Sequence, residues 1–192
     1  HELSGEVVEV GSSVHRLQAG DRVIGELAVG VCGKCSMCRK GKYEFCKVKT
    51  PPGWASQGVY AEYAVMKAWL LHRLPDEVEY DVAAIAEPTA ICMYGCLERA
   101  AISPDDLVVI YGMGPIGLLS LIVLRDSGVE RIVCVTPISH GTQRYDLARA
   151  LGAPVVVSPE ENPEAAVAAA SQGEMADFVV DCSGAPRAIN EG

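Results

Sequence analysis

The chain has 192 residues, 49% of them hydrophobic and only 6% aromatic, which is enough for one large or two small hydrophobic cores. Its formal net charge of −9 opposes binding to a nucleic-acid backbone, and no apolar run reaches the roughly 20 residues that a membrane-spanning helix needs. We therefore expect a soluble, cytoplasmic protein that has neither a membrane nor a nucleic acid as its partner.

The first part of the chain, residues 5–75, consists of short strand-like runs that are broken by glycine. One run covers Glu6–Val10, another covers Arg22–Gly25 after the Gly20-Asp21 turn, and apolar residues alternate along Val59–Val65. Such runs are typical of β-strands, so this half is predicted to be β-rich.

Four cysteines follow the spacing C-x2-C-x2-C-x7-C at Cys32, Cys35, Cys38 and Cys46. Four thiolates form a closed tetrahedral zinc site, which stabilises a fold and leaves no position open for a substrate. Disulfide pairing is an alternative, but no secretory signal is evident. An iron–sulfur cluster is another, although ferredoxins use a shorter last gap that is followed by proline. We predict a structural zinc site.

The segment around these cysteines is basic, with a formal charge of +5 between residues 31 and 50. Its basic residues are Lys34, Arg39, Lys40, Lys42, Lys47 and Lys49, and its one acid is Glu44. These cations would offset the charge of about −2 that four thiolates and one Zn²⁺ create. A nucleic-acid-binding zinc ribbon has the same composition and stays an alternative. The formal charge of −14 on the rest of the chain argues against it.

From about residue 80 the pattern changes to apolar runs that alternate with helical stretches, which is the signature of βαβ units. A helical stretch covers Asp81–Ala101. Strands are predicted at Leu107–Tyr111, Arg131–Thr136, Pro154–Val157 and Asp177–Asp181, with helices at Pro115–Ser127, Gln143–Leu151 and Pro163–Ser171. Four parallel strands would form a doubly wound sheet whose strand ends create a crevice for a ligand.

A glycine-rich motif follows the first of these strands and matches G-x-G-x-x-G. It contains Gly112, Gly114, Pro115, Ile116 and Gly117. Glycines at these positions admit the pyrophosphate of a dinucleotide, and the N-terminus of the following helix stabilises its negative charge. The motif therefore predicts dinucleotide binding. The alternative is an ordinary glycine-rich turn.

The sequence lacks the acid that usually binds the ribose of NAD. NAD sites carry an acid about 20 residues after the motif, whereas the count here reaches Thr136, and no acid occurs from Arg131 to Tyr145. His140 and Arg144 follow in a polar loop that could hold a 2′-phosphate. We therefore expect NAD or NADP as cofactor with a preference for NADP. Arg144 could instead simply begin the next helix on a solvated face.

Taken together, these motifs resemble the zinc-dependent medium-chain dehydrogenases, most of all the sorbitol and threonine dehydrogenase branch. The segments that carry the resemblance are residues 1–11, 20–23, 32–46, 87–90, 112–117 and 181–184. The resemblance implies an α/β protein. A partial GroES-like catalytic domain would cover residues 1–88, with a zinc lobe at 31–50, and a partial Rossmann domain would cover residues 89–192.

The resemblance also implies a second, catalytic zinc. His1 and Glu2 match the family's His-Glu pair, and Glu87 matches a position that is acidic in the polyol branch. The family's cysteine ligand has no counterpart in this sequence, which therefore resembles an internal fragment that lacks both ends. Glu87 could instead be an acid favoured at the start of a helix, with Pro88 at the first helical position.

By resemblance, the expected activity is hydride transfer between NAD(P) and a secondary alcohol such as a polyol, sugar or cyclitol. The full-length protein is expected to be a homo-oligomer. Trp54 and Tyr60 could line the substrate pocket or could be core aromatics. The alternative to an enzyme is an inactive, zinc-stabilised nucleotide-binding fragment or scaffold module.

Overall fold

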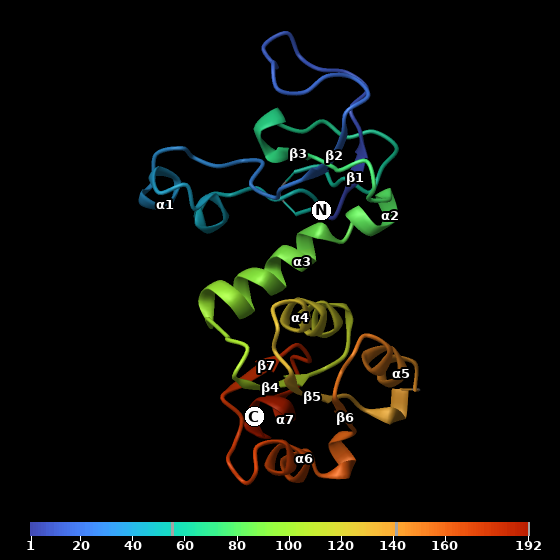
Figure 1. Cartoon of the computed structure of the whole chain (residues 1–192). Helices are drawn as coiled ribbons and strands as arrows, with labels where there is room; N and C mark the ends of the chain where they lie inside the picture. Colours follow the sequence, from blue (N-terminus) through green and yellow to red (C-terminus); the bar gives the residue numbers. More distant parts are fainter. Residues whose placement is uncertain (55, 141, 192) are drawn as a thin grey trace. The chain divides into compact units, whose positions relative to one another are not determined.

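The computed structural model describes residues 1–54, 56–140 and 142–191. The chain divides into two compact units at a boundary between Glu87 and Pro88. Figure 1 labels the helices and strands of each unit.

The first unit contains a three-stranded antiparallel sheet of β1 (Ser4–Glu6), β2 (Arg22–Gly25) and β3 (Leu71–Arg73), in the order β1-β2-β3. Val23 of β2 lies opposite Gly5 of β1 on one side and opposite Arg73 of β3 on the other. A small core of buried residues lies beside the sheet and contains Val7, Leu17 and Val23. This unit is therefore held by a short sheet and little apolar packing.

Two of the strands predicted for this unit are wrong. The backbone of Val7 still bonds to Asp21 and Gly20, but beyond it Val8 is 64% exposed and β1 has already ended at Glu6. Residues 59–65 pair with no strand among the described residues, and Val65 is fully exposed. Apolar alternation predicts a strand only where a partner strand accepts its hydrogen bonds, and these runs have none.

The helical elements of residues 1–99 are short. They comprise α1 (Ser36–Arg39), α2 (Tyr80–Ala83) and α3 (Ala86–Met93), 3₁₀ turns at Tyr43–Phe45 and Ala68–Leu70, and a π-helical turn at Tyr94–Arg99. The predicted helical stretch after residue 80 is therefore confirmed as a broken series of helices rather than one. Because α3 begins at Ala86, Glu87 lies in its first turn and Pro88 occupies the third position, not the first.

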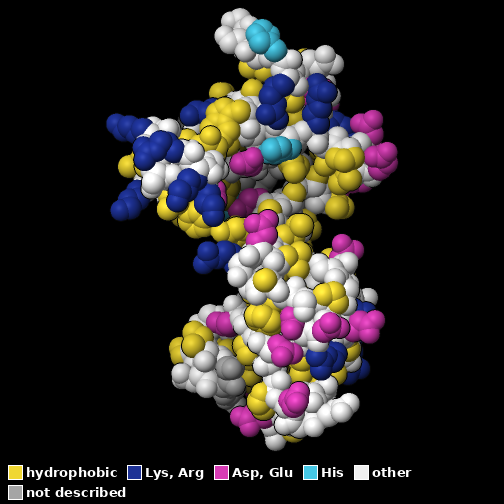
Figure 2. All heavy atoms as spheres, turned by 60° about the vertical axis from the view of Figure 1, so that its left-hand side comes forward, with side chains coloured by type: hydrophobic (Ala, Val, Ile, Leu, Met, Phe, Trp, Pro, Cys, Tyr) yellow, Lys and Arg dark blue, Asp and Glu magenta, His cyan; other side chains and the backbone are white. Residues whose placement is uncertain are grey.

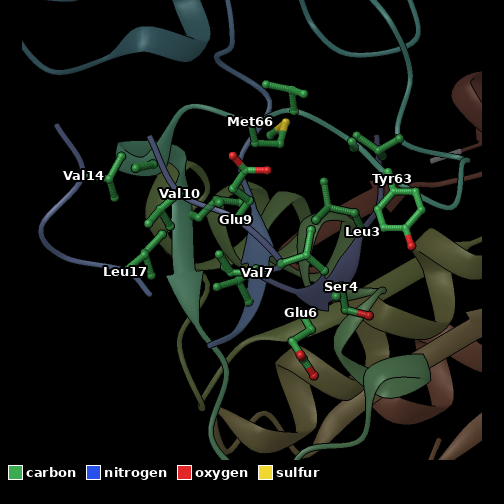
Figure 3. A pocket seen from close by; sticks show the side chains of 18 of the residues that line it. Leu3, Ser4, Glu6, Val7, Glu9, Val10, Val14, Leu17, Tyr63 and Met66 are labelled. Carbon is green, nitrogen blue, oxygen red and sulfur yellow. The ribbon is translucent and has the colours of Figure 1, made fainter. Parts of the chain in front are cut away.

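A pocket of about 710 Å³ opens beside β1 in the first unit. In Figure 3, Val7, Val10, Val14 and Leu17 lie on one side of it, and Leu3 and Tyr63 on the other, with Met66 between them. Its lining is mainly apolar. His1, Glu2 and Glu87 do not line it, so it is separate from the residues with metal-binding side chains.

The second unit contains a four-stranded sheet with the order β6-β5-β4-β7. Its strands are β4 (Leu107–Tyr111), β5 (Arg131–Val135), β6 (Val155–Val157) and β7 (Phe178–Asp181). All three strand pairs are parallel. The prediction of four parallel strands is confirmed, and each strand end lies within one residue of its predicted position.

Helices cover both faces of this sheet, as Figure 1 shows. They are α4 (Pro115–Asp126), α5 (Gln143–Ala150), α6 (Pro163–Ala170) and α7 (Pro186–Glu191). Alternate residues of β4 enter two different cores: Val108 and Ile110 pack with side chains of α4 and α5, whereas Val109 packs with α6 and α7. Burial on both faces explains why β4 and most of β5 are continuous apolar runs, and the helices on both faces confirm the doubly wound arrangement.

Within the described ranges, no helix has the length and apolar character that crossing a membrane requires.

Candidate metal and nucleotide sites

The four cysteines of the basic segment converge, as their spacing predicts. The Sγ atoms of Cys32, Cys35, Cys38 and Cys46 all lie within 4.8 Å of one another, and those of Cys32 and Cys38 are 3.9 Å apart. Tetrahedral zinc with Zn–S bonds of about 2.3 Å places its sulfurs roughly 3.8 Å apart. A disulfide would need about 2.05 Å, and all four cysteines are free. The arrangement fits one Zn²⁺.

Backbone amides point at these sulfurs. The N–H of Cys35 donates to Cys32 Sγ at 3.3 Å, and the N–H of Cys38 donates to Cys35 Sγ at 3.5 Å, which also caps α1. The N–H of Cys32 donates to Cys46 Sγ at 3.5 Å. Donors of this kind stabilise thiolates, which are the zinc-binding form.

The pKa values of the lobe thiols are shifted in different directions. Amide donors, first that of Lys34 and then that of Cys35, lower the pKa of Cys32 to about 6. The amide of Cys32, followed by that of Val48, lowers the pKa of Cys46. Burial, followed by the neighbouring thiol of Cys35, raises the pKa of Cys38 to about 12. Bound zinc would therefore have to displace the proton of Cys38.

Basic side chains surround the thiol cluster on the outside. Figure 2, in which the side of the first unit that carries α1 comes forward, shows Lys and Arg side chains gathered over this part of the surface. The charge of the cluster and the charge of its surroundings are therefore opposite in sign, as the composition predicts.

His1, Glu2 and Glu87 form a second cluster of side chains that could hold a metal ion. Each offers one ligand atom, and these atoms lie within 4.8 Å of one another. The distance from His1 Nε2 to Glu87 Oε2 is 3.7 Å. Ligand atoms on tetrahedral zinc with bonds of about 2.1 Å lie roughly 3.4 Å apart, and three protein ligands plus one open position are typical of catalytic zinc. The donor set fits such an ion.

Hydrogen bonds of β1 and β2 bring these residues together across more than 80 positions of sequence. Ser4 Oγ, close to Glu2, donates to the carbonyl of Tyr80 at 2.5 Å. The guanidinium of Arg22 donates to the carbonyls of residues 75, 76 and 78 at 2.6 to 3.1 Å and stacks 4.5 Å over the Tyr80 ring. These contacts fix the loop that leads into α2 and α3, and so they fix the position of Glu87.

The environment of Glu87 is that of a carboxylate which needs a cation. Burial raises its pKa, and the negative charge of Glu2 raises it further, while the charge of Lys49 lowers it. Its side chain is 14% exposed. Two carboxylates and an imidazole held this close are stabilised when a divalent cation binds between them.

The glycine-rich motif forms the turn between β4 and α4. A Cβ on Gly117 would lie 1.8 Å from the carbonyl oxygen of Gly112, so only glycine fits there. Gly112 has a φ of +90°, and a Cβ on it would lie 2.9 Å from the backbone of Ser183. A Cβ on Gly114 would meet nothing within 4 Å. Two glycines thus permit close packing, and the third borders open space.

The start of α4 has the features of an anion site. Gly114 is the N-cap, Pro115 occupies one of the first two helical positions, and no side chain caps the helix. The first N–H groups of an uncapped helix are available to a phosphate. Ile116 is 39% exposed beside them. Asp181 and Ser183 were not expected in this region from the sequence, although their motif carries part of the resemblance.

Ser183 packs against Gly112, and its N–H and hydroxyl both donate to Asp181 Oδ1, at 2.9 and 2.6 Å. These hydrogen bonds lower the pKa of Asp181. The acid at the end of β7 is therefore held ionised next to the glycine turn.

The residues expected at the ribose are spread along the chain after β5. Thr136 directly follows β5 and is only 2% exposed, so its side chain faces the interior. Arg144 is exposed on the first turn of α5, and none of the described residues forms an ion pair with it. The side chain of His140 lies outside the described set.

An antiparallel unit with a four-thiol lobe, followed by a doubly wound unit with a glycine turn, is the architecture of a zinc-dependent, dinucleotide-binding oxidoreductase. The family model "Alcohol dehydrogenase GroES-like domain" matches residues 1–76. "Glucose dehydrogenase C-terminus" matches residues 81–192, more than half of the chain. The chain belongs to the family of zinc-dependent medium-chain dehydrogenases.

Two curated relatives show similar identity. D-arabitol-phosphate dehydrogenase of Enterococcus avium is 36% identical over 191 residues, covering 99% of this chain and 54% of the relative. Sorbitol dehydrogenase of Halalkalibacterium halodurans is 36% identical over 193 residues, covering 100% and 55%. The chain spans about half the length of the curated relatives it matches.

Solved structures show the same fold. An alcohol dehydrogenase from Escherichia coli CFT073 complexed with NADH has a TM-score of 0.85 and 28% identity, over 97% of this chain and 54% of that one. A zinc-binding dehydrogenase from Sinorhizobium meliloti bound to NADP has a TM-score of 0.86 and 28% identity, over 98% and 55%. Structures of this kind thus hold either cofactor.

Proposed function

We propose that this chain is the zinc- and nucleotide-binding part of an oxidoreductase that transfers hydride between a secondary alcohol and NAD(P). The observation that carries the proposal is the approach of His1, Glu2 and Glu87 to within 4.8 Å of one another. The two carboxylates repel each other, and a divalent cation bound between them and the imidazole would offset that repulsion. The proposal makes them the ligands of a catalytic zinc.

Each residue would have a separate task. His1 Nε2 and one oxygen from each of Glu2 and Glu87 would supply three lone pairs and leave one position for the substrate oxygen. Zinc bound there supplies Lewis acidity that lowers the pKa of an alcohol. Trp54 contacts the His1 ring with a centroid distance of 4.7 Å, which would restrict the orientation of the imidazole.

The cofactor would bind through the turn that precedes α4. Its pyrophosphate would accept hydrogen bonds from the uncapped N–H groups after Gly114, and Gly112 would allow its close approach. A preference for NADP follows from the absence of an acid between Arg131 and Tyr145 and from the exposed guanidinium of Arg144.

The NADP preference is tested by titrating the protein with NADH and NADPH and following nucleotide fluorescence. We expect NADPH to bind about tenfold more tightly, and Arg144→Ala to remove most of that difference, since a charge-assisted hydrogen bond contributes about 1.5–3 kcal/mol. Arg149→Ala is the matched control, because Arg149 stacks on Tyr145 in the same helix. Equal binding of the two nucleotides would refute the preference.

The proposed substrates are polyols and related sugar alcohols. The names of the two curated relatives, arabitol-phosphate and sorbitol dehydrogenase, support this class. Oxygen ligands such as Glu2 and Glu87 also suit a metal that receives a polyhydroxylated substrate. A homo-oligomeric assembly in the cytoplasm completes the proposal.

Zinc content tests the proposal most directly. We expect about two zinc ions per chain by elemental analysis, about one in Glu87→Ala, and about one in Cys46→Ser, with hydride transfer from a polyol to NAD(P)⁺ lost in Glu87→Ala. One zinc in the unaltered protein, nucleotide binding and no hydride transfer would favour the alternative, an inactive zinc-stabilised nucleotide-binding module.

A further inference from the structure

The two ends of the zinc lobe are paired at its base. The N–H of Thr50 donates to the carbonyl of Gly30 at 2.9 Å, and the two residues form an isolated antiparallel bridge. A Cβ on Gly30 would lie 1.7 Å from Thr50 Oγ1, so the two chain segments are in close contact there. Within the lobe, the N–H of Cys32 donates to Cys46 Sγ at 3.5 Å. Thiols that hold a metal would therefore also hold Thr50 in its place.

The chain that leaves this bridge forms a tight turn that contains Trp54. The N–H of Trp54 donates to the carbonyl of Pro51 at 3.3 Å, and the N–H of Gly53 donates to the carbonyl of Ser56 at 3.1 Å. The hydroxyl of Ser56 also donates to the carbonyl of Pro51, at 3.3 Å. These hydrogen bonds join residues within the turn, whereas the bridge at Thr50 attaches the turn to a distant part of the chain.

The indole of Trp54 lies against the cluster of His1, Glu2 and Glu87, the His1 cluster. Its ring centroid is 4.7 Å from that of the imidazole of His1, at an interplanar angle of 36°. Aromatic rings in contact have centroids about 4.5–7 Å apart. Trp54 is nevertheless 70% exposed. Burial among other side chains therefore does little to fix the indole, and the backbone of the turn has to hold it.

Neighbours that fix the orientation of a metal-binding side chain affect metal affinity strongly. Their substitution typically costs about 10–100-fold in affinity. Trp54 is such a neighbour of His1, and its turn is attached to the chain at the base of the zinc lobe. The first unit thus contains a continuous connection from the four thiols through the bridge and the turn to the imidazole.

We propose that Trp54 is a positioning residue that couples the two candidate metal centres of the first unit. When the thiols hold zinc, the bridge between Gly30 and Thr50 is closed and Trp54 rests against His1, which favours metal binding by the His1 cluster. When the thiols are empty, the turn loses its attachment and His1 loses its neighbour. Linkage makes the coupling reciprocal, so a filled His1 cluster raises the zinc affinity of the lobe by the same factor. The inference rests on the proposed function and makes that site dependent on the lobe.

Calorimetric zinc titration of the metal-free full chain tests the coupling with a double-mutant cycle of Cys46→Ser and Trp54→Ala. The ion that is lost in Glu87→Ala is the one bound by the His1 cluster. We expect each single variant to bind this ion about tenfold less tightly than the unaltered protein. The double variant should lose no more than either single variant, because both changes break the same connection. Trp54→Phe keeps a ring beside His1 and should retain most of the affinity.

Indole fluorescence gives a second measurement that leaves all metal-binding residues in place. The chain has two tryptophans, and Trp69 lies 5.2 Å from the ring of Tyr43 in the lobe. In Trp69→Phe, the emission comes from Trp54 alone. We expect the fluorescence anisotropy of Trp54 to rise when the first equivalent of zinc fills the lobe, because the indole becomes immobilised against His1. An anisotropy that stays unchanged would overturn the proposal.

The matched control is Trp69→Ala, which removes the indole that contacts the lobe rather than His1. With the lobe filled, we expect the His1 cluster of this variant to bind zinc as tightly as that of the unaltered protein. A loss equal to that in Trp54→Ala would overturn the proposal, since removal of either indole would then weaken the centre. Losses that multiply in the double variant would overturn it as well, because the lobe and Trp54 would then act independently.

Failure of the inference differs from failure of the proposed function. If the His1 cluster binds zinc with the same affinity in the unaltered protein, Cys46→Ser and Trp54→Ala, the proposed metal centre stands and the coupling is wrong. If the unaltered chain binds zinc at the lobe and none at the His1 cluster, both are wrong.

Discussion

The zinc lobe and the glycine turn are both candidate ligand sites, but they are held in different ways. In the lobe, four thiols converge and backbone amides point at their sulfur atoms. In the turn, Gly112 and Gly117 pack against neighbouring backbone at the end of a fully buried strand. We therefore expect the first site to need its ligand for stability and the second to be formed before any ligand arrives.

This contrast follows from the cores beneath the two sites. The sheet of the second unit is packed on both faces by four helices, so its strand ends are rigid. The lobe has only the short helix α1 and one 3₁₀ turn, too few residues to bury a core of their own. We propose that a metal ion replaces the missing core, and this dependence can be tested.

Removal of zinc is expected to have the largest effect. Structural zinc contributes an apparent binding free energy of about 10–16 kcal/mol in small zinc domains, so chelation or Cys46→Ser should unfold the lobe. Hydrogen exchange should show loss of amide protection over residues 31–50 and unchanged protection over β4 and β5. Protection of the lobe that persists after complete zinc removal would contradict the contrast.

The second-largest effect is expected at the turn, where two glycines separate stability from binding. Gly117→Ala places a methyl group against the carbonyl of Gly112 and should destabilise the protein by about 3 kcal/mol in chemical denaturation. Gly114→Ala meets no atom within 4 Å and should cost about 1 kcal/mol or less.

The same pair of variants tests nucleotide binding. Gly114→Ala should weaken NAD(P)H binding about tenfold, because its methyl group enters the space where a pyrophosphate would approach the start of α4. If Gly114→Ala binds the nucleotide as tightly as the unaltered protein, the pyrophosphate does not lie there.

A smaller effect is expected in the order of thiol modification. Zinc removal should expose the thiol of Cys32 as the lobe unfolds, whereas Cys134 stays buried in the core of the second unit, where burial raises its pKa to about 12. Iodoacetamide should therefore label Cys32 first and Cys134 last, as mass spectrometry of peptides would show. Zinc should protect Cys32. Labelling of Cys134 before Cys32 would disprove the assignment.

The smallest effect is expected at Asp181. Its pKa is lowered by the hydroxyl and N–H of Ser183, so the stabilisation is present above the ordinary carboxyl pKa and is lost as pH falls through the folded pKa. Ser183→Ala removes one donor and should raise the pKa of Asp181, measured by NMR titration of its carboxyl carbon. An unchanged pKa would show that the remaining N–H bonds suffice.

The two units also differ in how well the sequence predicts them. The strands β4, β5 and β6 are mostly buried apolar runs, and β7, although partly exposed, contains the apolar run Phe178–Val180, so residue type alone locates them. In the first unit, the apolar alternation at Val8 and Val10 is typical of a strand, but no described strand pairs with these residues. Whether a neighbouring strand is available depends on the whole fold and not on the segment itself. Local patterns cannot show whether a partner strand is present.

The candidate sites show the same limit. The thiol cluster is predictable because its four ligands lie within 15 residues and only their spacing matters. The approach of His1 to Glu87 depends on contacts that Ser4 and Arg22 make with residues 75–80, and no spacing rule contains them. It was expected only through resemblance. The contact of Ser183 with Gly112 joins β4 to β7 and leaves no mark in the sequence.

The position of Glu87 in α3 depends on Arg22, a residue of β2. Its guanidinium binds three carbonyls of the loop after β3 and stacks on Tyr80. If Glu87 were exchanged for another ligand in order to change the metal, the backbone at this position would still follow the course that the contacts of Arg22 hold. Redesign of this centre therefore begins at β2, where a change of one side chain would move a ligand that it never touches.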